Sequence, residues 1–296
     1  MAPAESAVND FDEKKAYAAQ EEEGQKYFDD GREIDLLHFV YGHEKIDEIR
    51  GSPQKVLAAI DEYGRTKKYL MNVGDDKGKI VCDLIRKHKP NTLVELGGYV
   101  GYSAVLFGDA VRQAGGKRLF SLEFNPEFAA VIMSLVDLAG LSDIVKVHVG
   151  SSANSIKRLH AAGLLSHIDM MFLDHSKPAY TTDLKLCESL NIVGPGSVLA
   201  ADNCVKPGNP PYLRYVRSTV EEKRKALELG DAATDDKAGL SEKYGYLFQD
   251  AVSEKKLGST EKGNPNLVYD SKRIDSFEPT GIPDALEISI CVKEES

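Results

Sequence analysis

The sequence has no tryptophan, only four cysteines and no long apolar run. Its cysteines include no Cys-x-x-Cys pair, so neither a zinc cluster nor a disulfide framework is indicated. No stretch reaches the ~20 consecutive apolar residues that a membrane-spanning helix needs, so we expect no membrane insertion. Residues 1–30 are acidic and lack the apolar core of a secretory signal, which predicts a cytoplasmic protein.

Basic residues are scarce relative to acidic ones. The 37 lysines and arginines face 47 aspartates and glutamates, for a net charge of −10. Nucleic-acid-binding proteins usually present a basic face to the phosphates, so this balance argues against a nucleic-acid partner and favours a small-molecule substrate. With 42% hydrophobic residues, the 296-residue chain can bury a substantial core. We expect a monomer or a weak homodimer.

From about residue 52 onward, short β-branched runs alternate with amphipathic stretches. The pattern predicts strands at 92–96, 118–123, 145–149, 169–173 and 197–201. The intervals between them are long enough for crossover helices, which is typical of a parallel sheet. Two late apolar runs, 267–274 and 285–292, predict an antiparallel hairpin at the sheet edge. The sequence therefore predicts an α/β fold.

The composition also suggests how the chain is divided. Residues 1–50 are interpreted as an N-terminal extension, partly helical or disordered, and residues 51–296 as a single domain. After Arg217 the chain becomes charged and alanine-rich with weak periodicity. This change predicts an insertion at about 218–266.

A glycine-rich turn follows the first predicted strand. Gly97, Gly98 and Gly101 would let the backbone pass close to a ligand, but their spacing is not that of the dinucleotide fingerprint Gly-x-Gly-x-x-Gly. An NAD-dependent dehydrogenase is therefore disfavoured. Glu95 at the strand end suits a cofactor with a cationic amino-acid end. Glu123, which ends the second strand, is placed to accept hydrogen bonds from ribose hydroxyls.

Polar residues also end the fourth and fifth predicted strands. Asp174 follows the fourth, and Asp202 and Asn203 follow the fifth, so all three are expected at the carboxyl edge where ligands of open parallel sheets bind. Carboxylate and amide oxygens favour Mg²⁺ over zinc. Lys177 could reach a metal-bound hydroxyl and act as a base. His175 is interpreted equally well as a packed residue or a cofactor contact.

Five collinear segments resemble the catechol O-methyltransferase family, within the class I S-adenosylmethionine-dependent methyltransferases. They are MNVGDDKGKI at 71–80, VELGGYVGYSAV at 94–105, LEFNPEFAA at 122–130, FLDHSK at 172–177 and LAADN at 199–203. The resemblance implies a Rossmann-like fold, with a mostly parallel seven-stranded sheet, an antiparallel C-terminal hairpin and helices on both faces. It also implies S-adenosylmethionine and Mg²⁺ as cofactors.

The resemblance assigns roles residue by residue. It implies Asp174, Asp202 and Asn203 as magnesium ligands, and Lys177 and Glu278 as catalytic residues. Implied cofactor contacts are Met71, Val73, Glu95, Gly97, Tyr99, Ser103, Glu123, Phe124, Ser152, Asp174 and His175. Implied substrate contacts are Tyr69, Met71, Lys177, Asn203, Pro207 and Glu278.

One assignment rests on spacing, and two positions depart from the family. Glu278 is found by counting back six residues from Asp284, which opens an Asp-x-Leu-Glu segment, and Asp275 is a near competitor. Tryptophan gatekeepers of the family are replaced here by Tyr69 and Ser176. Losing a large flat wall predicts a more open substrate slot.

The expected function is transfer of a methyl group from S-adenosylmethionine to one hydroxyl of a catechol. Mg²⁺ would bind both oxygens, and Lys177 would remove the proton. One alternative is a magnesium-dependent O-methyltransferase of another phenolic, such as a caffeoyl-type substrate. Another is a non-catalytic homologue that binds S-adenosylmethionine.

Overall fold

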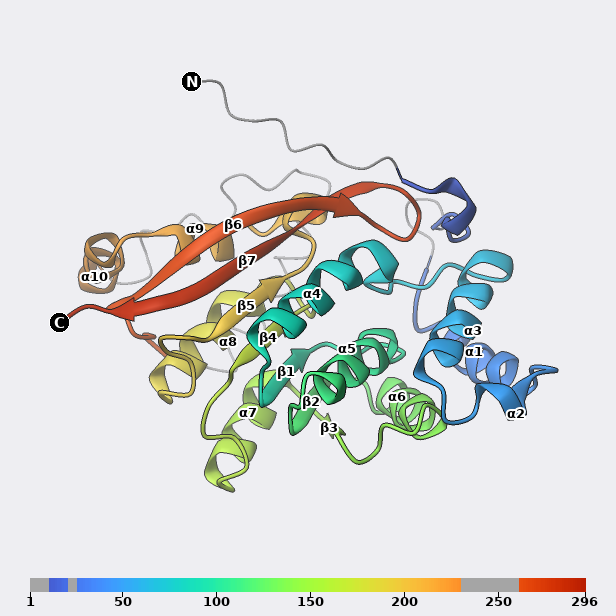
Figure 1. Ribbon diagram of the computed structural model, residues 1–296. Helices are drawn as coiled ribbons and strands as arrows, with labels where there is room; N and C mark the ends of the chain where they lie inside the picture. The colour runs from blue at the N-terminus through green and yellow to red at the C-terminus, as the bar shows by residue number, and fades with distance from the viewer. Residues whose placement is uncertain (1–10, 21–25, 230–260) are drawn as a thin grey trace.

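The computed structural model describes residues 11–20, 26–229 and 261–296, which fold around a seven-stranded sheet (Figure 1). The strand order is β3-β2-β1-β4-β5-β7-β6. The strands are β1 Thr92–Leu96, β2 Arg118–Glu123, β3 Val145–Val149, β4 Met170–Leu173, β5 Val198–Ala201, β6 Leu267–Phe277 and β7 Pro283–Glu294. Neighbours among β1 to β5 are parallel, whereas β7 runs antiparallel to β5 and β6.

The predicted sheet is confirmed, including its antiparallel C-terminal hairpin. The first three strands have the predicted bounds, and β4 and β5 each begin one residue later than predicted. The hairpin is longer than the apolar runs indicated, because β6 and β7 continue into the turn at 278–282. All residues of β4 and β5 are buried, as expected of strands covered on both faces.

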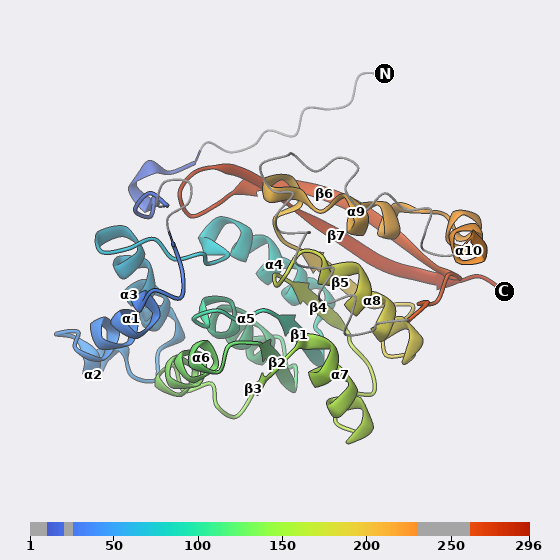
Figure 2. The same ribbon diagram turned by 180° about the vertical axis from the view of Figure 1, so that it is seen from behind.

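Helices cover both faces of the sheet (Figures 1 and 2). They are α1 Arg32–Tyr41, α2 Ile46–Ile49, α3 Pro53–Thr66, α4 Gly74–His88, α5 Tyr102–Gln113, α6 Pro126–Leu138, α7 Ser152–Ala161, α8 Ala179–Ser189, α9 Pro210–Arg217 and α10 Val220–Leu229. Apolar side chains of α4, α5 and α6 form a core with Leu93, and those of α7, α8 and α9 form a second core with Val94. Successive strand residues point to opposite faces, so β1 contributes to both cores.

Local signals explain where several helices begin. Ser52, Asn125 and Asn209 each accept a hydrogen bond from a backbone N–H of the first turn. In each case proline is the next residue, where its missing N–H costs nothing and its fixed φ suits the helix. These pairs place the starts of α3, α6 and α9.

The predicted N-terminal extension and the predicted insertion are partly described. Leu36 and Val40 on α1, within the predicted extension, are fully buried in the core that also holds α3 and α6. The first helix of the predicted insertion is α10, and residues 230–260 lie outside the described residues. Within the described ranges, no helix is long and apolar enough to cross a membrane.

The connections create a crevice at one edge of the sheet. From β1 the chain moves outward to β2 and β3, and it then returns to place β4 and β5 on the other side of β1. Adjacent loops therefore diverge at the carboxyl ends of β1 and β4. Open parallel sheets bind ligands at such a switch point.

Candidate functional site

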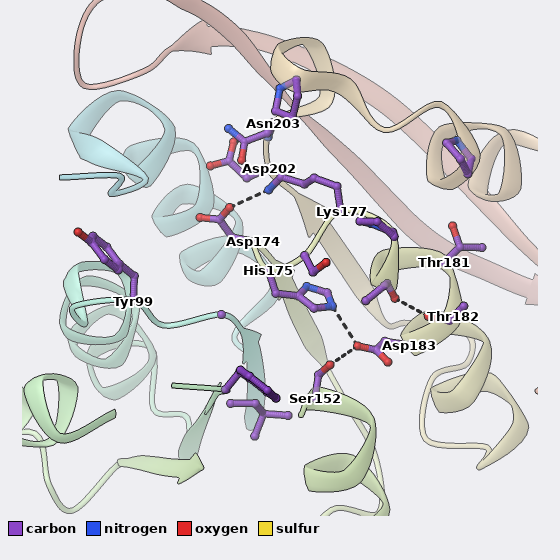
Figure 3. A pocket seen from close by; sticks show the side chains of 18 of the residues that line it. Tyr99, Ser152, Asp174, His175, Lys177, Thr181, Thr182, Asp183, Asp202 and Asn203 are labelled. Carbon is purple, nitrogen blue, oxygen red and sulfur yellow. Dashed lines mark hydrogen bonds and ion pairs between the residues drawn. The ribbon is translucent and has the colours of Figure 1, made fainter. Parts of the chain in front are cut away.

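A cavity of about 1270 Å³ lies at this switch point. Figure 3 shows the side chains that follow β4 and β5 on its wall, with Lys177 reaching Asp174 below Asp202 and Asn203. The predicted site residues that line the cavity are Tyr69, Met71, Val73, Gly97, Tyr99, Ser103, Glu123, Phe124, Ser152, Asp174, His175, Lys177, Asp202, Asn203, Pro207 and Glu278. Glu95 is the exception among the predicted residues, because it is fully buried behind the wall.

The glycine-rich turn packs tightly against the end of β4. Gly97 has φ +86°, and a Cβ there would lie 2.5 Å from the carbonyl oxygen of Asp174. A side chain at residue 97 would thus push the two strand ends apart. Glu123 holds the same turn, since its Oε2 accepts from the N–H groups of Gly98 at 3.0 Å and Tyr99 at 2.9 Å. Glu123 is therefore tied to the glycine turn as well as lining the cavity.

Glu95 is a buried carboxylate with incomplete hydrogen bonding. Its Oε2 accepts from the hydroxyl of Ser121, whereas Oε1 has no hydrogen-bond partner among the described residues. Burial raises the pKa of its carboxyl to about 7. Unpaired buried oxygens are uncommon in native proteins, and a cationic or hydrogen-bond-donating ligand would relieve this one.

A lysine that the sequence analysis missed lies among the acidic strand ends. Lys77 on α4 is fully buried, and its Nζ lies 2.5 Å from Asp202, 2.8 Å from Glu278 and 3.1 Å from Asp284. Burial lowers the pKa of Lys77, but the three carboxylates raise it well above its usual value. The carboxylates lie within 4.8 Å of one another, so this acidic group already holds a cation of the protein itself.

The other predicted metal residues adjoin this group. Asn203 donates from Nδ2 to Glu278 at 2.8 Å and to Asp284 at 3.2 Å, which directs its carbonyl oxygen elsewhere. Asp174 does not belong to the acidic group around Lys77. Burial raises the pKa of Asp174 to about 7, and the charge of Asp202 acts in the same direction. The strand ends thus bring together two carboxylates that favour a nearby positive charge.

The predicted base, Lys177, is held in place from two sides. Its Nζ donates to Asp174 Oδ1 at 3.1 Å and to the hydroxyl of Tyr180 at 2.7 Å. Its side chain is only 12% exposed. Lys177 is therefore a partly buried amine beside the predicted metal ligands and open to the cavity.

Two of the predicted cofactor contacts, Ser152 and His175, are linked through Asp183. His175 stacks on Tyr180 with ring centroids 4.9 Å apart, and its Nε2 lies 2.9 Å from Asp183 Oδ2. The hydroxyl of Ser152 donates to the same carboxylate oxygen. His175 Nδ1 is buried with no hydrogen-bond partner among the residues the structure describes. This nitrogen is another polar atom that a ligand can satisfy.

The structure separates Glu278 from its competitor. Glu278 lies in the turn between β6 and β7 and contacts Lys77 and Asn203 at the cavity wall. Burial raises the pKa of its carboxyl to about 8. Asp275 instead lies on β6, 2.9 Å from the side chain of Arg273. Of the two, Glu278 lines the cavity, and its catalytic role stays a prediction.

One of the missed residues, Lys77, carried a detectable signal in the sequence. Lys77 lies on one helical face with Val81 and Ile85, so a lysine on an apolar stripe was visible in the pattern. Asp284 served only as a counting reference, yet its oxygens accept from the backbone N–H of Val205 at 3.0 Å and from Lys77. No spacing signal singled out Asp183.

Comparison with known proteins identifies the family. A family model described as "Methyltransferase domain" matches residues 94–204. Catechol O-methyltransferase from Bos taurus is 43% identical over 186 residues, which cover 63% of this chain and 66% of that protein. The Mus musculus enzyme is 41% identical over 188 residues, covering 64% and 69%. This chain belongs to the catechol O-methyltransferase family.

Solved structures show the same fold. An O-methyltransferase from Bacillus cereus in complex with SAH has a TM-score of 0.51 at 17% identity, covering 87% of this chain and 97% of that one. The O-methyltransferase TomG from Streptomyces achromogenes, in complex with SAM, has a TM-score of 0.51 at 21% identity, covering 81% and 89%. The segment shared with the Bos taurus and Mus musculus family members spans about two thirds of their length. The predicted metal ligands and Lys177 lie within residues 94–204, which the family model matches, whereas Glu278 lies beyond this range.

Proposed function

We propose that this chain transfers a methyl group from S-adenosylmethionine to one hydroxyl of a catechol-type vicinal diphenol, with Mg²⁺ as the metal. The observation that carries the proposal is the position of Lys177, whose amine contacts Asp174 at the wall that also presents Asp202 and Asn203. An amine beside hard oxygen ligands is the arrangement needed to remove a proton from a metal-bound hydroxyl.

The cavity fits S-adenosylmethionine in both charge and size. Gly97 lines the cavity at the place proposed for the methionine end of the cofactor, and behind this wall Glu95 holds an unsatisfied carboxylate oxygen whose charge would attract the ammonium group. Glu123 lies at the end of β2, where related folds bind ribose. Toward adenine, His175 offers an unsatisfied nitrogen. The cavity volume exceeds the range of typical ligand sites, which leaves room for a second substrate beside the cofactor.

The oxygen ligands fit Mg²⁺. Asp174, Asp202 and Asn203 supply two carboxylates and an amide carbonyl, and the raised pKa of Asp174 shows that added positive charge would stabilise its ionised form. When bound, Mg²⁺ would lower the pKa of a catechol hydroxyl and orient the catechol through both oxygens.

The chain's own residues supply the remaining chemistry. Lys177 Nζ accepts the proton of the reacting hydroxyl, and Glu278 hydrogen-bonds the neighbouring hydroxyl. The phenolate oxygen then forms a bond to the methyl carbon as the carbon–sulfur bond breaks, and S-adenosylhomocysteine leaves. The cavity walls hold the two reactants together, which removes the entropic cost of a bimolecular encounter.

A panel of isomeric diphenols tests the proposal. The full chain is incubated with methyl-labelled S-adenosylmethionine and Mg²⁺, and labelled products are identified by mass spectrometry. Catechol should be methylated, whereas resorcinol, which has the same composition but separated hydroxyls, should not. Excess EDTA should abolish transfer. Equal turnover of both isomers, or full activity in EDTA, contradicts the proposal.

The same panel separates the alternatives. Caffeoyl-type phenolics are included because Ser176 leaves this part of the wall open. A higher kcat/KM for these than for catechol would assign the larger substrate. Binding of S-adenosylmethionine without turnover of any phenol would identify a non-catalytic homologue.

A further inference from the structure

Residues 11–20, here called the N-terminal strap, lie beside the turn that connects β6 to β7 (Figures 1 and 2). The backbone N–H of Tyr17 donates to the carbonyl of Pro279 at 2.9 Å. At the other end of the strap, the ring of Phe11 lies 5.5 Å from that of Phe277. The strap therefore contacts both the end of β6 and the turn itself.

Tyr17 also attaches the strap to α3 and to Asn72, which precedes α4. Its hydroxyl donates to Asp61 on α3 at 2.6 Å and accepts from Asn72 at 3.4 Å. Its ring lies so close to Gly64 that a Cβ there would come within 2.6 Å of it. With 7% exposure, Tyr17 is buried between α3 and the hairpin. Tyr17 is therefore packed into the protein and does not lie on its surface.

The turn at 278–282 is closed on itself. Glu278 donates its N–H to the carbonyl of Ile282 at 2.8 Å, and Gly281 donates to the carbonyl of Glu278 at 2.8 Å. The turn is therefore hydrogen-bonded internally, and contacts with neighbouring segments set its orientation. Lys77 and Asn203 hold the Glu278 side chain, and further contacts hold the rest of the turn. Those contacts include Tyr17 and Gly74, where a Cβ would lie 2.8 Å from the Pro279 ring.

Two contacts of Tyr17, with Asn72 and with the 278–282 turn, lie at the reaction cavity. Asn72 lines it on one side, and Glu278, Thr280 and Ile282 line it on the other. Gln20, the last residue of the strap, lines the same cavity. The strap thus connects two walls that come from segments far apart in the sequence.

We propose that Tyr17 is a positioning residue, which holds the 278–282 turn so that the Glu278 carboxylate stays within reach of the substrate. This inference rests on the proposed function of Glu278. When the strap is released, the turn should tilt away from the cavity, so substrate should bind less tightly while the cofactor site is unaffected.

Side-chain variants of Tyr17 in the full chain provide the test. Tyr17→Ala should raise the KM for catechol about fivefold or more, with S-adenosylmethionine affinity within about twofold of the wild type. Tyr17→Phe keeps the ring contact with Gly64 and should recover most of this loss. Lys14→Ala alters an exposed strap residue and serves as the matched control, with unchanged KM. Phe11→Ala should show the same pattern as Tyr17→Ala if the latter does not fold.

Hydrogen exchange and a double-mutant cycle show how Tyr17 acts. Tyr17→Ala should accelerate amide exchange at residues 278–282, and its KM effect should disappear in a Glu278→Gln background. Unchanged exchange in the turn, or an equal KM effect in both backgrounds, overturns the inference. A wild-type chain that methylates no diphenol would reject the proposed function instead, and the exchange measurement would still decide whether the strap holds the turn.

Discussion

The ammonium of Lys77 lies 2.5 Å from the carboxylate of Asp202, and both side chains are at most 1% exposed. The same ammonium contacts Glu278 and Asp284, so one cation joins α4, the end of β5 and the β6–β7 hairpin. Asp202 is also a predicted metal ligand. The orientation of the Asp202 carboxylate is therefore set partly by Lys77 on α4, a helix that contributes no predicted metal ligand.

The first prediction concerns this buried charge. Lys77→Met should lower the free energy of unfolding by about 3–5 kcal/mol, because it leaves buried carboxylates without their cation. Added Mg²⁺ should recover part of this loss, since the ion would restore positive charge beside Asp202. Urea unfolding with and without Mg²⁺ measures both effects.

Lys79→Met provides the control for that measurement. Lys79 lies on the same helix but pairs with Asp75 at the surface, with 59% of its side chain exposed. Exposed pairs contribute at most about 1 kcal/mol, so this variant should unfold nearly as the wild type does. Equal stability losses in the two variants would show that burial of Lys77 is not the cause.

The sheet was predictable because its signals are local. Residues 92–96 and 118–123 are short segments rich in apolar residues between turn residues, which is typical of strands in a buried parallel sheet. The strand order places the residues after β4 and β5 at one edge. The position of Asp174 at the same sheet edge as Asp202 and Asn203 was therefore predictable from the sequence.

The contacts around Lys77 were not predictable in the same way. Its partners Asp202, Glu278 and Asp284 are 125, 201 and 207 residues away, and no periodic pattern encodes such distances. The same limit applies to Tyr17, whose partner Pro279 lies at the other end of the chain. Such contacts follow from how the elements pack, which local propensity does not determine.

The second prediction addresses the proposed base. Lys177→Met should bind S-adenosylmethionine within about twofold of the wild type but lose methyl transfer by at least about 100-fold, the usual contribution of general base catalysis. Calorimetric cofactor binding and labelled methyl transfer measure the two separately. Lys206→Met removes a positive charge from an exposed residue of the same cavity and should retain activity. Retained transfer in the Lys177 variant would remove this residue from the mechanism.

The third prediction concerns stability and cofactor binding at Glu95. Its folded pKa of about 7 lies above the ordinary value of 4.5, so its contribution to stability is complete below pH 4.5 and is lost as pH rises to 7. Glu95→Gln cannot ionise. Without cofactor it should therefore be more stable than the wild type above pH 7, by up to about 3 kcal/mol, and nearly equal to it at pH 4.5.

The same variant should bind S-adenosylmethionine at least about tenfold more weakly, because the amide cannot neutralise an ammonium group. Urea unfolding at pH 5 and pH 8, together with cofactor titration, measures both properties. Glu127→Gln alters an exposed glutamate at the start of α6 and should leave both unchanged. A variant that is no more stable at pH 8 would show that Glu95 is not held at a cost in the cofactor-free protein.

The last prediction concerns how the open wall affects substrate choice. Ser176 is exposed at the cavity, at a position where the family resemblance implies a tryptophan gatekeeper. Ser176→Trp should lower kcat/KM for caffeoyl-type phenolics by about tenfold, equivalent to about 1.4 kcal/mol of transition-state binding, through loss of space. Catechol is small enough to keep its kcat/KM within about twofold. Ser176→Ala removes the hydroxyl without adding bulk and should leave kcat/KM for both substrates unchanged. An equal loss of kcat/KM for both substrates in Ser176→Trp would contradict a role of residue 176 in substrate selection and would indicate a general effect on cofactor binding.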